Sequence, residues 1–339
     1  MTIAMPVVQT KSRGPWATAF NRLSRDRIAI VALGVFLLIV IACLLAPVYA
    51  LWAGVEPFKS TLNAVVTIDG VARPVMELPT TGLALGYTPI GPTWRFGSYF
   101  LGADNQGRDV MARLLYGGMN SFLIAGAATT FTLIFATGFG LLAGFFGGII
   151  DMVISRILDV LWAFPVYLLA ISLSIVLITE GITIGPIVID SGSLWLPIFI
   201  IGLIYIPYVA RPIRGQVMAL RTSDFVLASI SLGAPSSRIL WKDILPNIST
   251  TLIVFVPIMM ALNMLTESAL SFLSIGVQPP DASWGTIIQD GQGLLYTRPV
   301  VALAPGIMIV ISVLSLNVFG DGLRDALDPK SKIKLGRSG

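Results

Sequence analysis

The sequence predicts an all-α integral membrane protein with six transmembrane helices, and three observations lead to this class. Hydrophobic residues make up 55% of the 339-residue chain and charged residues only 12%, too few to cover a soluble globule of this size. About 20 apolar residues cross a hydrocarbon core of about 30 Å. Six uncharged windows have at least that length: 28–55, 114–150, 160–179, 191–210, 244–266 and 299–320.

The distribution of Lys and Arg is the third observation, and it predicts the orientation. If the six windows span the membrane, 16 of the 22 basic residues fall in one alternating set of loops, formed by both termini and by 151–159 and 211–243. The positive-inside rule therefore places both termini in the cytoplasm. The first window is too long for a signal peptide and no small-residue cleavage site stands out, so we expect it to be retained as a span.

These spans divide the chain into five parts. Residues 78–94 are crowded with Gly and Pro and cannot form a membrane helix, so the extended periplasmic segment between the first two helices is a loop or small lobe. The predicted parts are a cytoplasmic N-terminal segment (1–27), a first transmembrane helix (28–51), an external segment (52–115), a five-helix core containing a cytoplasmic loop at 211–247 (116–320), and a cytoplasmic tail (321–339).

Several chemistries are excluded by what the chain lacks. It has no His and a single Cys, Cys43, so it offers neither a Cys/His zinc site nor a Cys-His nucleophile pair. No G-x-x-x-x-G-K-[ST] loop occurs, so it cannot hold nucleotide phosphates in that way. We therefore expect no cofactor, no metal and no enzymatic activity in this chain. The net charge of +4 fits an inside-positive membrane topology and an anionic lipid surface, and gives no reason to expect nucleic acid.

A stripe of small residues marks the second window. Ala136, Gly140, Gly144 and Gly148 recur at every fourth position. On a helix they would form one ridge that allows another helix to approach closely. We interpret the ridge as a helix-packing surface without a ligand role.

The polar stretch 224–246 lies between the fourth and fifth windows. Thr222 or Ser223 can cap a short helix over 224–232, Gly233 can end it, and a second helix from Ala234, Pro235 and Ser236 is predicted to run to Pro246. Phe225, Ala228 and Leu232 would share one face, with Ser229 at its edge. Such a helical hairpin either packs back on its own bundle or the membrane surface, or inserts into a groove of another protein.

Three residues are candidates for a pathway or gate: Asn263 and Glu267 at the outer end of the fifth window, and Trp284 in the following segment, which suits the outer membrane face. An ionisable residue inside a membrane is a functional candidate, but Glu267 can also lie at the interface, where it needs no special role. The segment "DNQGRD" departs from the spacing of a calcium loop. We interpret it as a polar turn that caps the second span, with Asp109 and Arg113 able to pair on the following helix.

The stretch 224–246 resembles the cytoplasmic coupling loop of permeases from binding-protein-dependent ABC importers, whose pattern is Glu-Ala-Ala, Gly four residues later, and Ile-x-Leu-Pro or a close variant. Leu227, Ala228 and Ser229 stand at the Glu-Ala-Ala positions, and Gly233 is the Gly. Because Leu replaces the acid, the resemblance implies that one possible salt bridge to the ATPase is missing while the apolar docking is kept. The resemblance implies that the coupling residues are Asp224, Phe225, Leu227, Ala228, Ser229, Leu232, Gly233, Ala234, Pro235, Ile244, Leu245 and Pro246.

The resemblance extends over nearly the whole chain from about residue 100 and is closest to the C-type permease subunit of the dipeptide, oligopeptide and nickel group. The segments that carry it are "LGADNQGRDVMARLLYGGMNSF", "LLAGFFGGIIDMVISRILDVLWAFP", "TESALSFLSIGVQPPDASWG" and "NVFGDGLRDALDP". It implies a type I ABC importer permease fold in a bacterial inner membrane. It also implies a second homologous permease chain, two ATPase subunits that use ATP and Mg, and an extracytoplasmic solute-binding protein.

Peptide import is then the leading hypothesis for function. Members of the same group for oligosaccharides or nickel are the first alternative, because selectivity is expected mainly in the binding protein. An ion-driven secondary transporter is the second alternative, but it would call for charged or unwound sites at the midplane and inverted repeats, and neither is visible. A membrane anchor without transport would leave the small-residue ridge and the coupling pattern unexplained.

Overall fold

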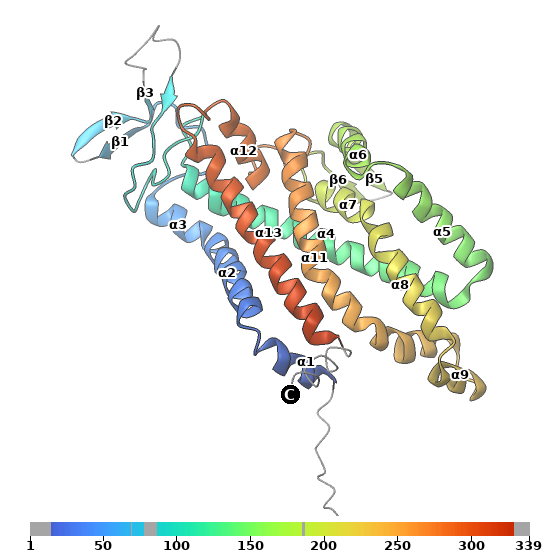
Figure 1. Cartoon of the computed structure of the whole chain (residues 1–339). Coiled ribbons are helices and arrows are strands. Elements are labelled where there is room, and N and C mark those ends of the chain that lie inside the picture. The colour runs from blue at the N-terminus through green and yellow to red at the C-terminus, as the bar shows by residue number, and fades with distance from the viewer. Residues whose placement is uncertain (1–14, 69, 78–86, 185–186, 329–339) are drawn as a thin grey trace, which may run out of the picture.

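The computed structural model describes residues 15–68, 70–77, 87–184 and 187–328, which form a bundle of long helices with short strands at one end (Figure 1). The N-terminal helices are α1 (Pro15–Leu23), α2 (Arg27–Leu44) and α3 (Ala46–Ala53). The central helix α4 (Val110–Phe146) is followed by α5 (Gly148–Ala163), α6 (Val166–Glu180), α7 (Trp195–Ile204), α8 (Ile206–Arg221) and α9 (Asp224–Ser231). The last elements are α10 (Ser236–Arg238), the π-helix η1 (Ile239–Ile244), α11 (Leu245–Phe272), α12 (Trp284–Gln292) and α13 (Val300–Leu327).

Within the described ranges, four helical stretches are long and apolar enough to cross a membrane, and up to six spans result if two bent pairs each count as one. The bent pairs are α5–α6, with a bend of 89°, and α7–α8, with a bend of 43°. The prediction that 151–159 is a loop is wrong, because these residues lie inside α5. The chain turns earlier, at Gly147 and Gly148, whose φ angles of +66° and +55° suit glycine, and Pro165 separates α5 from α6.

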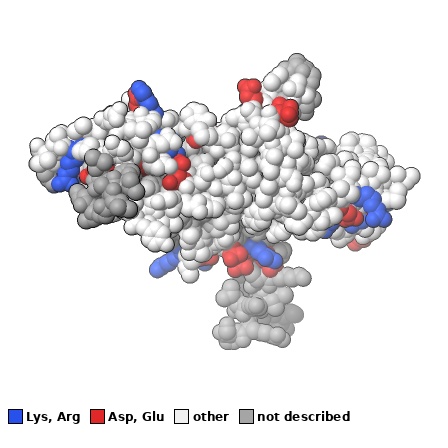
Figure 2. All heavy atoms as spheres, turned by 90° about the horizontal axis from the view of Figure 1, so that it is seen from above, with Lys and Arg blue, Asp and Glu red and all other residues white. Residues whose placement is uncertain are grey.

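Both described ends of the chain lie at the same end of the bundle. Helix α1 and the end of α13 lie at the lower side of the bundle in Figure 1, and α9 lies at the same side but well apart from them; we call this side the α9 end. Strands β1–β4 and α12 lie at the opposite, lobe end. The Arg22 guanidinium donates a hydrogen bond of 3.1 Å to the Asp328 carbonyl and so joins the two chain ends. In Figure 2, charged side chains form small separate groups on a face that is otherwise uncharged.

The described chain is mostly helical, but it is not all-α as predicted. Antiparallel pairs form between β1 (Val65–Ile68) and β2 (Val71–Pro74), β3 (Met76–Glu77) and β4 (Thr88–Pro89), and β5 (Ile182–Ile184) and β6 (Ile187–Ile189). The first four strands belong to the predicted external segment, where β-branched residues favour extended structure. Val75, Ile90, Tyr99 and Ala103 form a small core beneath them. Part of the Gly- and Pro-rich stretch, 78–86, and the predicted basic tail, 329–339, lie outside the described residues.

The central helix α4 connects the two main apolar cores. One core joins α4 to α7, α8 and α11, and the other joins α4 to α2, α12 and α13. Gly140 and Gly144 face α8 so closely that an added Cβ atom would lie 2.6 Å from the Ile213 side chain or 2.7 Å from that of Val217. Ala136 is also fully buried. Gly148 does not belong to this stripe, because it begins α5 after the turn and a Cβ atom there would meet nothing within 4 Å.

Candidate functional sites at the two ends of the bundle

The predicted hairpin at 224–246 begins with the short helix α9, which projects from the α9 end (Figure 1). Ser223 occupies the N-cap position with extended backbone, although its hydroxyl donates to the Leu220 carbonyl at 2.5 Å and leaves the helix N–H groups uncapped. Val226 is completely buried in the core that contains α8 and η1. A single buried side chain therefore anchors α9 to the bundle.

Gly233 ends α9 in the left-handed conformation expected from the sequence, with φ of +73°. The Gly233 N–H donates to the Ile230 carbonyl at 2.9 Å, and the Ala234 N–H donates to the Ser229 carbonyl at 3.1 Å. These two bonds form a Schellman motif, which satisfies the last carbonyl groups of the helix. Ala234 packs against the main core, so the turn after α9 is fixed both by hydrogen bonds and by packing.

The outer face of α9 is apolar and exposed. Phe225 and Leu232 are 43% and 87% exposed, and Ala228 is exposed on the same face, as the helical spacing predicted. Leu227 is also exposed. Large apolar side chains gathered on a projecting element suit contact with another protein or with the membrane surface.

The second arm of the hairpin differs from the prediction. It does not end at Pro246, because α10 passes through the π-helix η1 directly into α11. Pro246 has no N–H to donate to the carbonyl four residues earlier, and the preceding turn is widened so that the Leu245 N–H bonds to the Leu240 carbonyl. Ile244 is fully buried. The hairpin is thus rigidly continuous with the long helix α11.

A cluster of hydrogen bonds surrounds Glu267 near the lobe end. The Glu267 carboxylate is fully buried and accepts hydrogen bonds from Ser121 of α4 at 2.9 Å and from Ser271 of its own helix at 2.7 Å. Ser121 Oγ also accepts from the Trp284 backbone N–H at 3.2 Å, and Ser271 Oγ accepts from the Val277 N–H at 3.1 Å. Glu267 therefore packs inside the protein, where it joins α4, α11 and the start of α12, and the alternative position at the membrane interface does not hold.

The other two pathway candidates are also buried. Trp284 is fully buried, and its indole N–H donates to the Leu114 carbonyl at 2.9 Å. The Asn263 amide donates to Thr129 Oγ1 at 2.9 Å, and its carbonyl oxygen has no hydrogen-bond partner among the described residues. Trp284 and Glu267 meet through Ser121, whereas Asn263 lies one helical turn away along α11 and bonds to a different part of α4.

A buried network of charges joins the start of α4 to α12. Arg108 contacts Asp104 at 2.7 Å and Asp290 at 2.9 Å, and Arg113 contacts the same two carboxylates at 2.7 and 3.0 Å. The predicted pair between Asp109 and Arg113 does not form. Asp109 instead caps α4 by accepting from the Ala112 N–H at 2.8 Å and from the Tyr99 N–H. The side chain of Arg113 is 3% exposed, so its ion pairs lie inside the protein.

Burial is the largest influence on the pKa values of Asp104 and Asp290. It raises the pKa of Asp290 to about 6, although the charge of Arg108 opposes this shift. Burial also raises the pKa of Asp104, again against the charge of Arg108 and the N–H groups that donate to it. Arg108, Arg113 and Asp290 line a cavity of about 610 Å³ together with Phe58 and Gln278.

Sequence reasoning missed part of both sites. Asp290 lies 182 residues from Arg108, and no sequence spacing indicated that they meet. Ile230 of α9 and Trp241 of η1 are also exposed, by 47% and 67%. The sequence could have indicated them, because both are large apolar residues within the polar stretch 224–246.

Long apolar helices, a projecting hairpin and glycine-mediated packing define a polytopic membrane protein. Residues 136–333 match the family of binding-protein-dependent transport system inner membrane components, and residues 14–62 match the N-terminal transmembrane domain of oligopeptide transport permease C. The chain therefore belongs to the first of these families. This membership and the apolar helices make it a multi-pass membrane protein.

Three permease proteins of transport systems are similar to almost the whole chain. The dipeptide transport system permease protein DppC of Alkalihalophilus pseudofirmus is 33% identical, with 96% of this chain and 94% of that protein covered. The glutathione transport system permease protein GsiD of Pectobacterium atrosepticum is 31% identical, with 98% and 97% covered. The oligopeptide transport system permease protein OppC of Bacillus subtilis is 32% identical, with 95% and 92% covered.

Solved structures of the MetNI methionine ABC transporter in inward-facing conformations share the fold. One matches with a TM-score of 0.52 at 18% identity and covers 65% of this chain and 98% of the other. A second crystal form gives a TM-score of 0.51 at 20% identity, covering 64% and 97%. At this level of identity the likeness establishes a type I ABC importer permease fold.

Proposed function

We propose that this chain is a permease subunit of an ATP-driven, binding-protein-dependent importer, and that its substrates are peptides. The relatives named above are permeases for dipeptides, oligopeptides and glutathione, which supports peptides as the substrate class. The observation that carries the coupling role is the exposed apolar face of α9, held in one orientation by Val226 and the turn at Gly233.

The proposed assembly contains four kinds of chain. Two ATPase subunits, which use ATP and Mg, bind residues 224–235 at the α9 end. A second homologous permease chain supplies the other half of the pathway. An extracytoplasmic solute-binding protein delivers substrate at the lobe end. This arrangement places the α9 end in the cytoplasm of a bacterium and the chain in the inner membrane, with the six predicted spans.

Force applied to α9 reaches three helices, α8, α4 and α11. Helix α9 follows α8 after only two residues, and it packs against η1, which continues into α11. The stripe of Ala136, Gly140 and Gly144 fits α8 tightly against α4, so α8 cannot be displaced without moving α4. Arg214 on α8 also contacts Asp151 on α5 at 2.5 Å. We therefore infer that ATPase closure moves α8, α4 and α11 together as a lever.

The buried polar cluster has a supporting role in this proposal. Glu267 and Trp284 are enclosed by protein and hold α12 against α4 and α11 at the lobe end. They fix the outer gate, and Asn263 ties α11 to α4 one turn further inside the bundle. Direct contact with the solute is assigned to none of the three residues, because each is fully buried within the chain.

The lever is tested by Gly233→Val in the complete importer. Valine is strained at φ of +73°, while a Cβ atom there would meet nothing within 4 Å, so the effect acts through the backbone alone. We expect transport in proteoliposomes to be lost while ATP hydrolysis continues and the complex still assembles. Gly215→Val is the matched control, because Gly215 lies in α8 with equal free space and no left-handed conformation. Wild-type transport by Gly233→Val would refute the lever.

The energy source separates the importer from an ion-driven secondary transporter. Uptake into right-side-out vesicles that enclose ATP should require that ATP and stop when vanadate is enclosed with it. Uptake that follows a proton or sodium gradient and ignores ATP and vanadate would eliminate the proposed function. The substrate class is tested separately by binding assays on the cognate solute-binding protein, in which dipeptides and longer peptides compete with oligosaccharides and nickel.

A further inference from the structure

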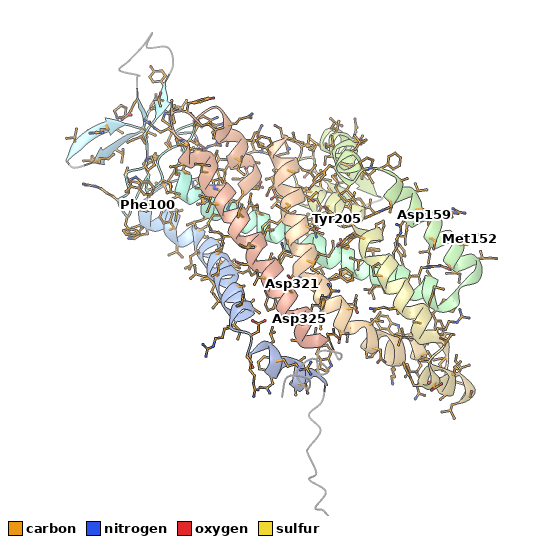
Figure 3. The ribbon with its side chains drawn as sticks, viewed as in Figure 1. Phe100, Met152, Asp159, Tyr205, Asp321 and Asp325 are labelled. Atoms are coloured by element: carbon orange, nitrogen blue, oxygen red, sulfur yellow. The ribbon has the colours of Figure 1, made fainter. Side chains whose placement is uncertain are left out.

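An exposed group of aromatic side chains stands at the lobe end beside α3. Trp94 and Phe96 are 65% and 89% exposed, and both rings contact Phe100. The Phe96 and Phe100 rings are stacked with centroids 5.4 Å apart, and the Trp94 ring meets Phe100 edge-on at 5.8 Å. Figure 3 labels Phe100 at the edge of the molecule, near the upper end of the N-terminal helices. Large apolar rings are thus held together on the outside of the protein.

The backbone holds this group in a defined turn. The Trp94 N–H donates to the Phe100 carbonyl at 3.2 Å, and Thr93 Oγ1 donates to the Tyr99 carbonyl at 3.0 Å. Trp94 and Tyr99 have φ angles of +54° and +58°, a conformation that costs a non-glycine residue about 1–2 kcal/mol. A turn that bears this strain and still exposes its rings indicates a use for the exposed rings.

The depth of the turn follows from its link to the first span. Helix α2 begins at Arg27 after its cap Asp26, and a core of about 30 Å is crossed by about 20 helical residues at about 1.5 Å each. The outer boundary of the hydrocarbon then lies close to Tyr49 in α3. The Tyr49 hydroxyl donates to the Gly97 carbonyl at 2.8 Å, which places the turn at the same depth.

The apolar outer surface of the first span continues into the turn. Exposed side chains run along this span to its outer end, including Ile41, Leu44, Leu45, Val48, Leu51 and Trp52. The rings of Tyr49 and Trp52 lie 6.2 Å apart at the level of the turn. Tyr and Trp are enriched where the hydrocarbon meets the headgroups, because their rings combine an apolar body with a polar edge.

We propose that residues 94–97, which we call the aromatic turn, insert into the outer headgroup region of the bilayer and anchor the lobe end to the membrane. The occupant of this surface is phospholipid. Continuity with the lipid-facing side of α2 and α3 favours lipid over a soluble binding protein, which would approach the lobe from above. The anchor does not depend on the transported substrate or on ATP.

The test uses Phe96→Cys in the complete importer, reconstituted in nanodiscs with partner chains that lack reactive cysteines and labelled with the fluorophore NBD. The native Cys43 is 1% exposed, and unsubstituted protein labelled in parallel measures any reaction there. Expected are a blue-shifted emission, strong quenching by a phospholipid that carries a shallow nitroxide, and weak quenching by aqueous iodide. Val71→Cys on β2 is the matched control, because Val71 is 56% exposed on the hairpin and should be quenched by iodide alone.

Two results would overturn the anchor. If iodide quenches the fluorophore equally at positions 96 and 71, and the lipid nitroxide does not quench it at position 96, the aromatic turn lies in water. Shielding of position 96 from both quenchers would indicate a protein contact, either with the second permease chain or with the solute-binding protein. Because all readings are made without ATP or substrate, a failure of the importer proposal would leave them unaffected.

Discussion

The α9 hairpin and the buried polar clusters of the lobe end place polar and apolar side chains in opposite ways. At the α9 end, Phe225 and Leu232 are exposed and one buried Val226 attaches the helix. At the lobe end, Arg113 and Glu267 are buried; Arg113 contacts two carboxylates and Glu267 accepts hydrogen bonds from serine hydroxyls. Covering exposed apolar surface with a partner lowers the free energy of the system. Removing the partner of a buried charge, in contrast, destabilises the protein. The exposed face of α9 therefore suits contact with a partner, whereas the buried clusters of the lobe end hold α4, α11 and α12 together.

The largest effect is expected from Arg113→Ala. The change leaves Asp104 and Asp290 without one of their two cations in a buried site, and breaking a buried ion pair costs about 3–5 kcal/mol. The melting temperature of the purified complex measures the loss. Arg211→Ala is the control, because its pair with Asp159 is about half exposed and is expected to contribute about 0–1 kcal/mol. If the two variants lower the melting temperature equally, the buried charges at the lobe end contribute no more to stability than an exposed pair does.

A smaller loss is expected from Gly144→Ala, which tests the link between the ends. The new Cβ atom would lie 2.7 Å from the Val217 side chain and 2.8 Å from the Arg214 carbonyl. Overpacking of this kind costs about 1–3 kcal/mol and should separate α4 from α8. Both the melting temperature and the transport per ATP hydrolysed should fall. Gly138→Ala, where a Cβ atom meets nothing within 4 Å, should change neither.

The pH dependence of stability should isolate one member of the charge network. Because the pKa of Asp290 is raised to about 6, the folded protein binds a proton there more tightly than the unfolded chain does. Stability from this group is present below its unfolded pKa, near 4, and is lost as pH rises to about 6. The melting temperature should therefore fall over this window and fall less steeply in Asp290→Asn. If the melting temperature of Asp290→Asn falls as steeply with pH as that of the unsubstituted protein, groups other than Asp290 account for the fall.

The smallest effect on stability is expected from Leu232→Ser. The side chain is 87% exposed, and substitutions at such positions usually change the free energy of unfolding by less than about 0.5 kcal/mol. Transport should nevertheless fall sharply, because the apolar contact with the ATPase is lost. Co-purification of the ATPase subunits measures that contact. Normal transport with normal co-purification would show that the partner does not cover this face.

Patterns local to one helix were predictable from the sequence. The apolar windows located the long helices, and the spacing of Gly140 and Gly144 indicated the close approach of another helix. The end of α9 at Gly233 also followed, since a Schellman motif depends on neighbouring residues and on one glycine. The roles of the coupling and pathway residues stay proposals, because they depend on chains outside this structure.

Contacts between distant segments were not predictable. Arg113 has an acid four residues before it, so local spacing favoured Asp109, yet the fold brings Asp104 and Asp290 closer. Glu267 could be placed near the outer end of a helix, but only the packing of α4 and α12 shows that it is enclosed.

By itself the sequence determined that this chain crosses a membrane, roughly where its helices run, and to which family of transport components it belongs. These properties depend on composition, on hydropathy over about 20 residues and on short motifs, all of which act locally. The tertiary structure decided which charges are paired, which apolar faces stay uncovered, and that the aromatic turn lies at the depth of Tyr49. Each of these depends on segments that are far apart in the chain and meet only after packing.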